Sequence, residues 1–165
     1  MLDVPTPHFT DRVASAEQLV SRRELTPELS DMDREMLVTT LGRLRRSILD
    51  RGAAEQLLHG EPHPGNVLST SHGPKFIDLE TCCVGPVEFD LAHVPEAVSE
   101  QYAGSDHALL DGCRELVLAM VAAWRFDRCD QLPNGIAFGQ ELLNALRSRL
   151  LWPTIDDVFS RLDAS

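Results

Sequence analysis

The chain has 165 residues, a formal net charge of -11, and hydrophobic and charged fractions of 43% and 25%. These values are typical of one folded globular domain over residues 1–165 and exclude a disordered or fibrous protein. The acidic balance excludes a general nucleic-acid-binding surface, and no apolar run approaches the length of about 20 residues that a membrane span needs.

Two helices are predicted in the first third of the chain. Residues 9–29, FTDRVASAEQLVSRRELTPEL, predict a short helix that ends before Pro27, because a residue that precedes proline disfavours the helical conformation. Residues 29–52, LSDMDREMLVTTLGRLRRSILDRG, predict a longer helix with Ser30 or Asp31 as its cap and a stop at Gly52.

The next segment predicts a β-hairpin. NVLST and KFIDLE are two β-type runs, and the turn SHGP lies between them. If the turn is centred near His72, Asn66 lies opposite Asp78, and Glu80 points to the same face as Asp78. The hairpin therefore predicts that these polar side chains converge at its open end.

The rest of the chain predicts helices. Residues 105–126 form the expected core helix behind a Ser105 or Asp106 cap, and residues 135–152 and 154–162 form two more. We therefore expect a mainly α protein with one small β-hairpin, an α+β class, in which motifs over 57–94 precede a helical bundle over 95–165.

Residues 57–66, LLHGEPHPGN, are unusually rich in residues that carry chemistry. The catalytic loop of protein kinases has the form H-x-D-x-x-x-x-N and is followed by an aspartate that holds Mg²⁺. His59, Glu61 and Asn66 stand at those offsets, with Glu in place of Asp, and Asp78 is the later carboxylate. A carboxylate can orient an acceptor hydroxyl and take its proton, while amide and carboxylate oxygens are ligands that Mg²⁺ prefers.

Three segments, LLHGEPHPGNVL, FIDLE and GPVEFDLAHV, resemble the aminoglycoside phosphotransferase family of protein-kinase-like small-molecule kinases. The resemblance implies the helical C-terminal lobe of that fold, with ATP and Mg²⁺ as cofactors. By position it implies catalytic roles for Glu61, Asn66 and Asp78, with Asn66 and Asp78 as metal ligands. It further implies nucleotide-binding places for His59, Asn66, Asp78 and Glu80, and Asp90 as a tie to the catalytic loop.

The chain departs from the family pattern in three ways. Glu61 stands where the family has Asp, no G-x-G-x-x-G phosphate loop precedes the motif, and the only lysine, Lys75, lies within the hairpin. The family's N-terminal lobe is therefore expected to be absent, and the isolated chain is expected to be weakly active or inactive. The alternative is a non-catalytic remnant or binding module that needs a partner.

Several partners follow from these features. The resemblance implies a small acceptor with a hydroxyl group, among them aminoglycosides (and hence antibiotic resistance), choline-like amines, homoserine and sugars. Acidic side chains are candidates for meeting a cationic acceptor; they are Glu96, Glu100, Asp127 and Asp130. The face that an N-terminal lobe would cover is expected to be exposed, which predicts a homo-oligomer or a companion chain.

Zinc chemistry is a minor alternative, because His59-Gly60-Glu61 resembles half of the zinc deaminase signature. That signature requires two residues between its cysteines, whereas Cys82 and Cys83 are adjacent. The N-terminus, MLDVPTPHFTDR, lacks the basic cluster and apolar core of a secretory signal. We therefore expect a cytoplasmic location and four reduced thiols.

Overall fold

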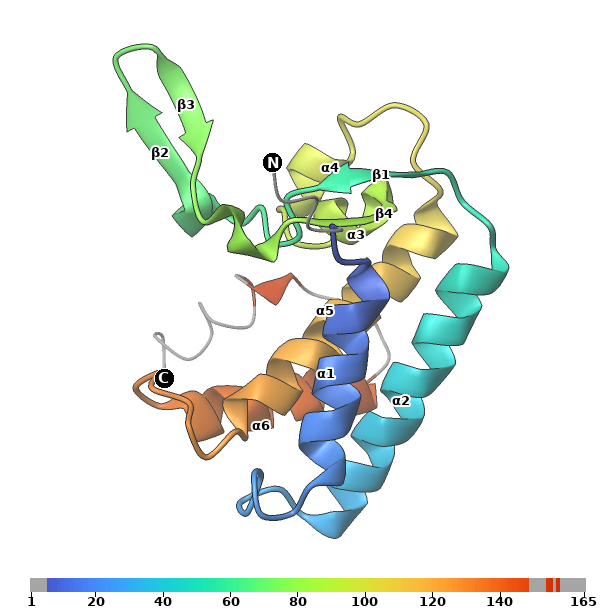
Figure 1. The fold of residues 1–165 in the computed structure, drawn as a ribbon, viewed down its shortest axis with the longest axis vertical. Coiled ribbons are helices and arrows are strands. Elements are labelled where there is room, and N and C mark those ends of the chain that lie inside the picture. Colours follow the sequence, from blue (N-terminus) through green and yellow to red (C-terminus); the bar gives the residue numbers. More distant parts are fainter. Residues whose placement is uncertain (1–5, 149–153, 156, 158–165) are drawn as a thin grey trace.

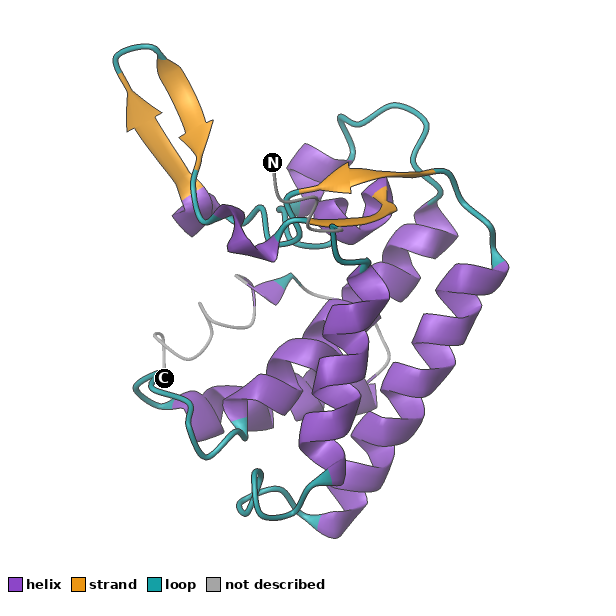
Figure 2. Cartoon of the chain, viewed as in Figure 1, coloured by secondary structure: helices purple, strands orange, loops and turns teal. Residues whose placement is uncertain are grey.

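The computed structural model describes residues 6–148, 154, 155 and 157, and shows a helical body that carries two small antiparallel sheets (Figures 1 and 2). The predicted mainly α class is confirmed. The helices are α1 (Phe9–Ser21), α2 (Asp31–Asp50), α3 (Val87–Leu91), α4 (Glu96–Ser99), α5 (His107–Arg125) and α6 (Gly135–Ser148). The strands are β1 (Glu55–Leu58), β2 (Val67–Thr70), β3 (Gly73–Phe76) and β4 (Cys83–Pro86), and the 3-10 helices are η1 (Pro64–Asn66) and η2 (Leu79–Thr81).

Helix α5 is the centre of the hydrophobic core and contacts α1, α2, α3 and α6. Its sequence is apolar on nearly every side, so it can be buried all round, and Cys113, Leu116 and Met120 are among its fully enclosed side chains. Asp106 caps it by accepting hydrogen bonds from the backbone N–H groups of Ala108 and Leu109. The predicted core helix and its cap are confirmed.

The first two helices pair side by side in Figure 1. The predicted α2 is confirmed, with Ser30 accepting a hydrogen bond from the Asp33 N–H at 3.2 Å. Helix α1 ends at Ser21, earlier than predicted. The Arg34 guanidinium explains this, because it donates to Thr26 and to carbonyl groups of the turn that follows the helix, which satisfies polar groups that a longer helix would have paired internally.

Two sheets are present where one hairpin was predicted. Strands β1 and β4 pair in an antiparallel sheet, with Leu58 opposite Cys83. Each strand of this sheet has only four residues. Such a short segment of the chain gives almost no alternation signal, so β1 was not predicted. This sheet places the start of the catalytic-loop motif at its edge, directly after Leu58.

The second sheet is the predicted hairpin, β2–β3, which projects away from the helical body in Figure 1. Its register differs from the prediction by one residue. Thr70 pairs with Gly73 across a two-residue turn, so Ile77, and not Asp78, lies across from Asn66. The tight turn is held by the Thr70 hydroxyl, which donates to the Gly73 carbonyl at 2.7 Å, and by Gly73 itself, whose φ is 99°.

Later elements follow the prediction in part. Helix α6 begins at Gly135 as predicted, whereas the short helices α3 and α4 were not predicted. The expected helix over 154–162 lies almost entirely outside the described residues. No helix in the described ranges is both long enough and apolar enough to cross a membrane.

Candidate active site

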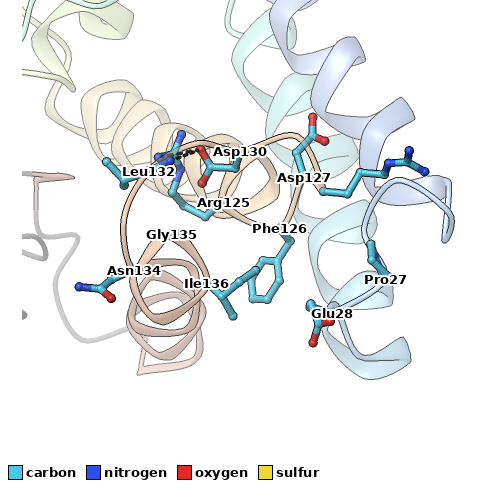
Figure 3. Close-up of a pocket in the computed structure, with 11 residues that line it drawn as sticks. Pro27, Glu28, Arg125, Phe126, Asp127, Asp130, Leu132, Asn134, Gly135 and Ile136 are labelled. Atoms are coloured by element: carbon cyan, nitrogen blue, oxygen red, sulfur yellow. Dashed lines mark hydrogen bonds and ion pairs between the residues drawn. The ribbon is translucent and has the colours of Figure 1, made fainter.

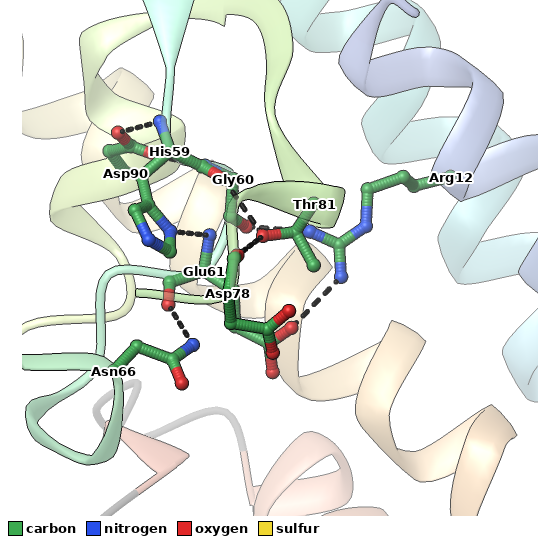
Figure 4. A network of polar contacts seen from close by, with 8 residues as sticks. All are labelled: Arg12, His59, Gly60, Glu61, Asn66, Asp78, Thr81 and Asp90. Atoms are coloured by element: carbon green, nitrogen blue, oxygen red, sulfur yellow. Dashed lines mark hydrogen bonds and ion pairs between the residues drawn. The ribbon is translucent and has the colours of Figure 1, made fainter. Parts of the chain in front are cut away.

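The motif residues 59–66 form a loop that leaves β1 and is fastened to α3 by Asp90 (Figure 4). The Asp90 carboxylate accepts the backbone N–H of His59 at 2.9 Å and that of Gly60 at 2.8 Å. Burial raises the pKa of Asp90, and the two N–H donors oppose that rise. The expectation that Asp90 ties this region to the loop is confirmed.

Gly60 allows the loop to turn back tightly. Its φ is 86°, a left-handed conformation that favours glycine, and a Cβ atom at this position would lie 2.0 Å from the Thr81 carbonyl oxygen. The loop and the η2 segment therefore touch backbone to backbone. The Thr81 hydroxyl strengthens this contact by donating to the His59 carbonyl at 2.9 Å.

Glu61 and Asn66 are joined directly. The buried Asn66 side chain donates its amide N–H to the Glu61 carbonyl at 2.9 Å. This bond fixes which side of the amide carries the oxygen, because the nitrogen is used by the loop. The Asn66 amide oxygen, at the end of the loop, is therefore not used by this bond and can accept a hydrogen bond or bind a metal ion.

Asp78 lies at the base of the hairpin, but not in a strand. It has φ 61° and ψ 57°, a left-handed conformation that Asp tolerates better than most residues, and it begins η2. Its side chain is exposed and makes no capping hydrogen bond. In the view of Figure 4 the side chains of Glu61, Asn66 and Asp78 extend to the same side of the network.

Glu80 does not follow the predicted strand geometry. It lies within η2, so the alternation that would have placed it on the same face as Asp78 does not apply. The side chain is exposed. Of the predicted site residues, the network of Figure 4 joins His59, Glu61, Asn66 and Asp78 and does not include Glu80.

Arg12 was not predicted as a site residue, yet it contacts the loop from α1. Its guanidinium donates to the Gly60 carbonyl at 2.7 Å and pairs with Glu61 Oε2 at 3.3 Å. It also lies 5.2 Å from the centre of the Trp124 ring. Since Arg12 is far from the motif in sequence, only the three-dimensional packing of α1 against the loop reveals it.

Two histidines make hydrogen bonds that support the loop, and a third, His93, is buried nearby. His59 Nε2 forms a hydrogen bond of 2.9 Å with the Ile77 carbonyl, and His63 Nδ1 accepts the Gly65 N–H at 3.0 Å. His93 is buried beneath them, and burial together with the positive charges of Arg12 and the two loop histidines lowers its pKa to about 3. The contacts of His59 and His63 agree with structural or orienting roles for these two side chains.

The donor set at the loop fits a magnesium ion better than zinc. Asn66 and Asp78 offer hard oxygen atoms, and Mg²⁺ is commonly held by one or two such groups together with substrate phosphates. Across the described ranges no group of three or more His, Cys, Asp or Glu side chains comes together as a metal cage. Cys83, moreover, is buried in β4, and burial raises the pKa of its thiol to about 11, which disfavours the thiolate that zinc requires.

A separate cavity of about 480 Å³ lies between the α1–α2 and α5–α6 connections (Figure 3). It contains two of the acidic residues considered for a cationic acceptor. Asp130 pairs with Arg125 at 3.4 Å, and Asp127 accepts the Cys129 N–H at 2.9 Å. Asp127 and one oxygen of Asp130 are thus engaged within the protein, whereas Asp130 Oδ2 is buried and has no hydrogen-bond partner among the described residues. Glu96 and Glu100 are exposed on or beside α4.

Comparison with known proteins identifies a family whose model matches this sequence and solved structures with a similar fold. The model of the Phosphotransferase enzyme family matches residues 2–130. The structure is similar to that of the choline kinase LicA from Streptococcus pneumoniae, with a TM-score of 0.63 and 15% identity over 84% of this chain and 54% of that one. It is also similar to an ethanolamine kinase from Plasmodium vivax, with a TM-score of 0.61 and 14% identity over 91% of this chain and 53% of that one. The chain spans about half the length of these structures.

Proposed function

The chain belongs to the phosphotransferase enzyme family, and from this premise we propose that it is the catalytic-loop half of an ATP- and Mg²⁺-dependent small-molecule kinase. The observation that carries the proposal is the loop itself. Asp90 holds its start, Asn66 is tied to Glu61, and Asp78 stands at the base of the hairpin. A kinase that phosphorylates a hydroxyl group requires a carboxylate to orient that hydroxyl and ligands to hold the metal, and the proposal assigns these roles to Glu61, Asn66 and Asp78.

In the proposed reaction the acceptor oxygen forms a bond to the γ-phosphorus of ATP, and the bond between that phosphorus and the β–γ bridging oxygen breaks. Glu61 orients the acceptor hydroxyl and takes its proton. Asn66 and Asp78 would hold Mg²⁺, which would neutralise charge on the phosphate oxygens. His59 fixes the loop against the hairpin through the Ile77 carbonyl, and Glu80 is left for an outer position near the nucleotide.

The acceptor is proposed to be a small amino alcohol. The support is the likeness in fold to proteins named as choline and ethanolamine kinases, together with the net charge of -11, which favours a cationic partner. An aminoglycoside, itself a cationic polyalcohol, is the second acceptor class to test.

A further part of the enzyme is proposed to cover the hairpin and β1. Apolar side chains are exposed on these elements, at 68% for Leu57, 55% for Phe76 and 62% for the adjoining Leu79. Exposed apolar surface of this kind tends to be covered by a partner or a second copy. Light scattering of the purified chain is expected to show self-association or a companion, and a strictly monomeric species at high concentration would count against this.

The test is phosphate transfer by the tagged chain purified from its own cells with any companion retained. We expect Mg²⁺- and acceptor-dependent phosphorylation of choline or ethanolamine, abolished by Asp78→Ala and unchanged by the control Glu35→Gln, which alters an exposed side chain of α2. The recombinant chain alone is expected to bind Mg·ATP only weakly and to turn over negligibly. Retained Mg·ATP binding that Asp78→Ala does not alter would contradict the proposal.

A second candidate function is a non-catalytic nucleotide- or ligand-binding module. The observation in its favour is that Glu61, in the base position, already forms an ion pair with Arg12. The two functions differ in one outcome of the same assay. Binding of Mg·ATP that depends on Asp78, without transfer to any hydroxyl acceptor including kanamycin, would favour the binding module.

A further inference from the structure

Arg12 makes two polar contacts with adjacent residues of the loop. One arm of its guanidinium, Nη1, donates to the Gly60 carbonyl at 2.7 Å, and the other, Nη2, reaches Glu61 Oε2 at 3.3 Å. The Arg12 side chain is 17% exposed and that of Glu61 is 30% exposed. The ion pair is thus partly shielded from water. Shielded pairs of this kind are stronger than pairs on an open surface.

The helix that carries Arg12 is itself fixed next to the loop. His8 caps α1, and the Pro7 carbonyl accepts the Val84 N–H of β4 at 2.8 Å. Phe9 and Val13 on either side of Arg12 are fully buried. Because α1 is anchored at its first turn, the guanidinium is presented from a rigid element and not from a loop.

The Trp124 ring further limits the positions that the Arg12 guanidinium can take. It belongs to α5, and its centre lies 5.2 Å from Arg12 Cζ, within the range of a cation–π contact. Arg12 is therefore held by α5, the Gly60 carbonyl and the Glu61 carboxylate together. Only a planar, forked cation suits this arrangement, since a lysine ammonium is a single point charge.

These contacts act on the residue by which the chain departs from its family. Glutamate has one methylene more than aspartate, so its carboxylate reaches further from the backbone and has one more rotatable bond. Arg12 holds both ends of Glu61, since it binds the carbonyl before it and Oε2 at its tip. Within the residues that the structure describes, Oε1 has no hydrogen-bond partner and is available to an acceptor hydroxyl.

We propose that Arg12 is a positioning residue that makes Glu61 competent in the base position by holding its longer side chain in one orientation. This inference rests on the proposed function above. It predicts that Arg12 and Glu61 act as a unit, so that the effects of substituting each of them on activity are not additive.

The first experiment does not depend on activity. In the folded full chain, NMR couplings of Glu61 between Hα and the two Hβ protons, and between the Hβ and Hγ protons, report whether χ1 and χ2 of its side chain each occupy one rotamer. We expect unequal couplings in the wild type and averaged couplings in Arg12→Gln. Arg45→Gln is the matched control, because Arg45 also pairs with a glutamate on a neighbouring helix, Glu17, and is away from the loop. Unchanged Glu61 couplings in folded Arg12→Gln would overturn the proposal.

Arg12→Lys is the second variant for this NMR experiment and is used if Arg12→Gln does not fold. It keeps the positive charge and most of the aliphatic part of the side chain. Lysine carries all its donors on one nitrogen and therefore fits less well between two acceptors that Arg12 reaches with separate nitrogens, so Glu61 is again expected to sample several rotamers. If Arg12→Lys retains the wild-type couplings, a planar fork is unnecessary and the proposal fails.

The second experiment uses transfer by the preparation that contains any companion. Displacing a catalytic group by about 1 Å can lower the reaction rate about 100-fold. Arg12→Gln is therefore expected to lower kcat by at least about tenfold with little change in the KM of the acceptor. In a Glu61→Gln background the same change is expected to alter kcat by less than about threefold. Equal losses in both backgrounds would show a merely structural role for Arg12.

The proposed function and the role of Arg12 can be contradicted separately. Absence of transfer in the wild-type preparation would contradict the proposed function, while the Glu61 couplings would still decide whether Arg12 orients the carboxylate. Transfer that is insensitive to Arg12→Gln would leave the phosphotransferase in place and contradict only the role of Arg12.

Discussion

The carboxylate of Asp90 accepts the backbone N–H of Gly60 at 2.8 Å, and so joins the helix α3 to the second residue of the catalytic-loop motif. The same carboxylate accepts the N–H of His59. Two backbone donors that share one carboxylate fix both the position and the direction of the loop as it leaves β1. The order of the site therefore depends on a residue that itself need not touch a substrate.

Asp90→Asn should loosen this tie. Asparagine keeps one acceptor oxygen and turns an N–H₂ group toward the second backbone donor, so one charge-assisted bond is lost and one donor is left without a partner. Such losses cost about 1.5–3 kcal/mol, and we expect the free energy of unfolding in urea to fall by that amount. Asp127→Asn should cost much less, because among the described residues the Asp127 carboxylate accepts only one exposed N–H, that of Cys129, and asparagine keeps an oxygen that can accept it.

Gly60→Ala tests the close approach of the loop to η2. A Cβ would lie 2.0 Å from the Thr81 carbonyl oxygen, and the left-handed φ adds about 1–2 kcal/mol for any other residue. Gly73→Ala is the matched control, since it has φ 99° but nothing within 4 Å of the added atom. We expect thermal unfolding to show a much larger loss for Gly60→Ala, and equal losses for the two variants would contradict the observed contact.

His93 should make the protein sensitive to mild acid. In the unfolded chain a histidine takes up a proton near pH 6.5, whereas burial lowers the pKa of His93 to about 3 in the folded protein. Between these values the unfolded state binds more protons, so the free energy of unfolding should fall as pH is lowered, by up to about 1.4 kcal/mol per pH unit.

The measurement is urea unfolding at several pH values between 7 and 5. His93→Gln should flatten the dependence over this range, even if it lowers stability at pH 7. His72→Gln, at the exposed hairpin turn, should leave the slope as in the wild type. A slope that His93→Gln does not change would show that other groups cause the acid sensitivity.

The sequence predicted those parts of the fold that carry strong local patterns. The helices α2 and α5 have long apolar repeats and capping residues, so their starts at Asp31 and His107 could be expected from Ser30 and Asp106. The strand β1 could not be expected, because its partner β4 is remote in sequence and its four residues show little alternation.

The predicted site residues stay a prediction, whereas the predicted geometry of the hairpin was wrong. The motif spacing indicated Glu61, Asn66 and Asp78, yet the hairpin register was wrong by one residue. A two-residue turn closed by the Thr70 hydroxyl replaced the expected turn around His72, and Asp78 left the strand. Turn length alone decides such a register, and this segment lacks the residue pairs that would fix it in advance.

The central claim is that Asn66 and Asp78 hold the metal–nucleotide next to Glu61, and paramagnetic broadening tests it most directly. Mn²⁺·ADP added to the ¹⁵N-labelled chain, at concentrations that detect weak binding, should broaden the amide signals of Glu61, Asn66 and Leu79 selectively. Both Asn66→Ala and Asp78→Asn should remove that selectivity. Broadening centred on another part of the chain, or the same pattern in the two variants, would contradict the account.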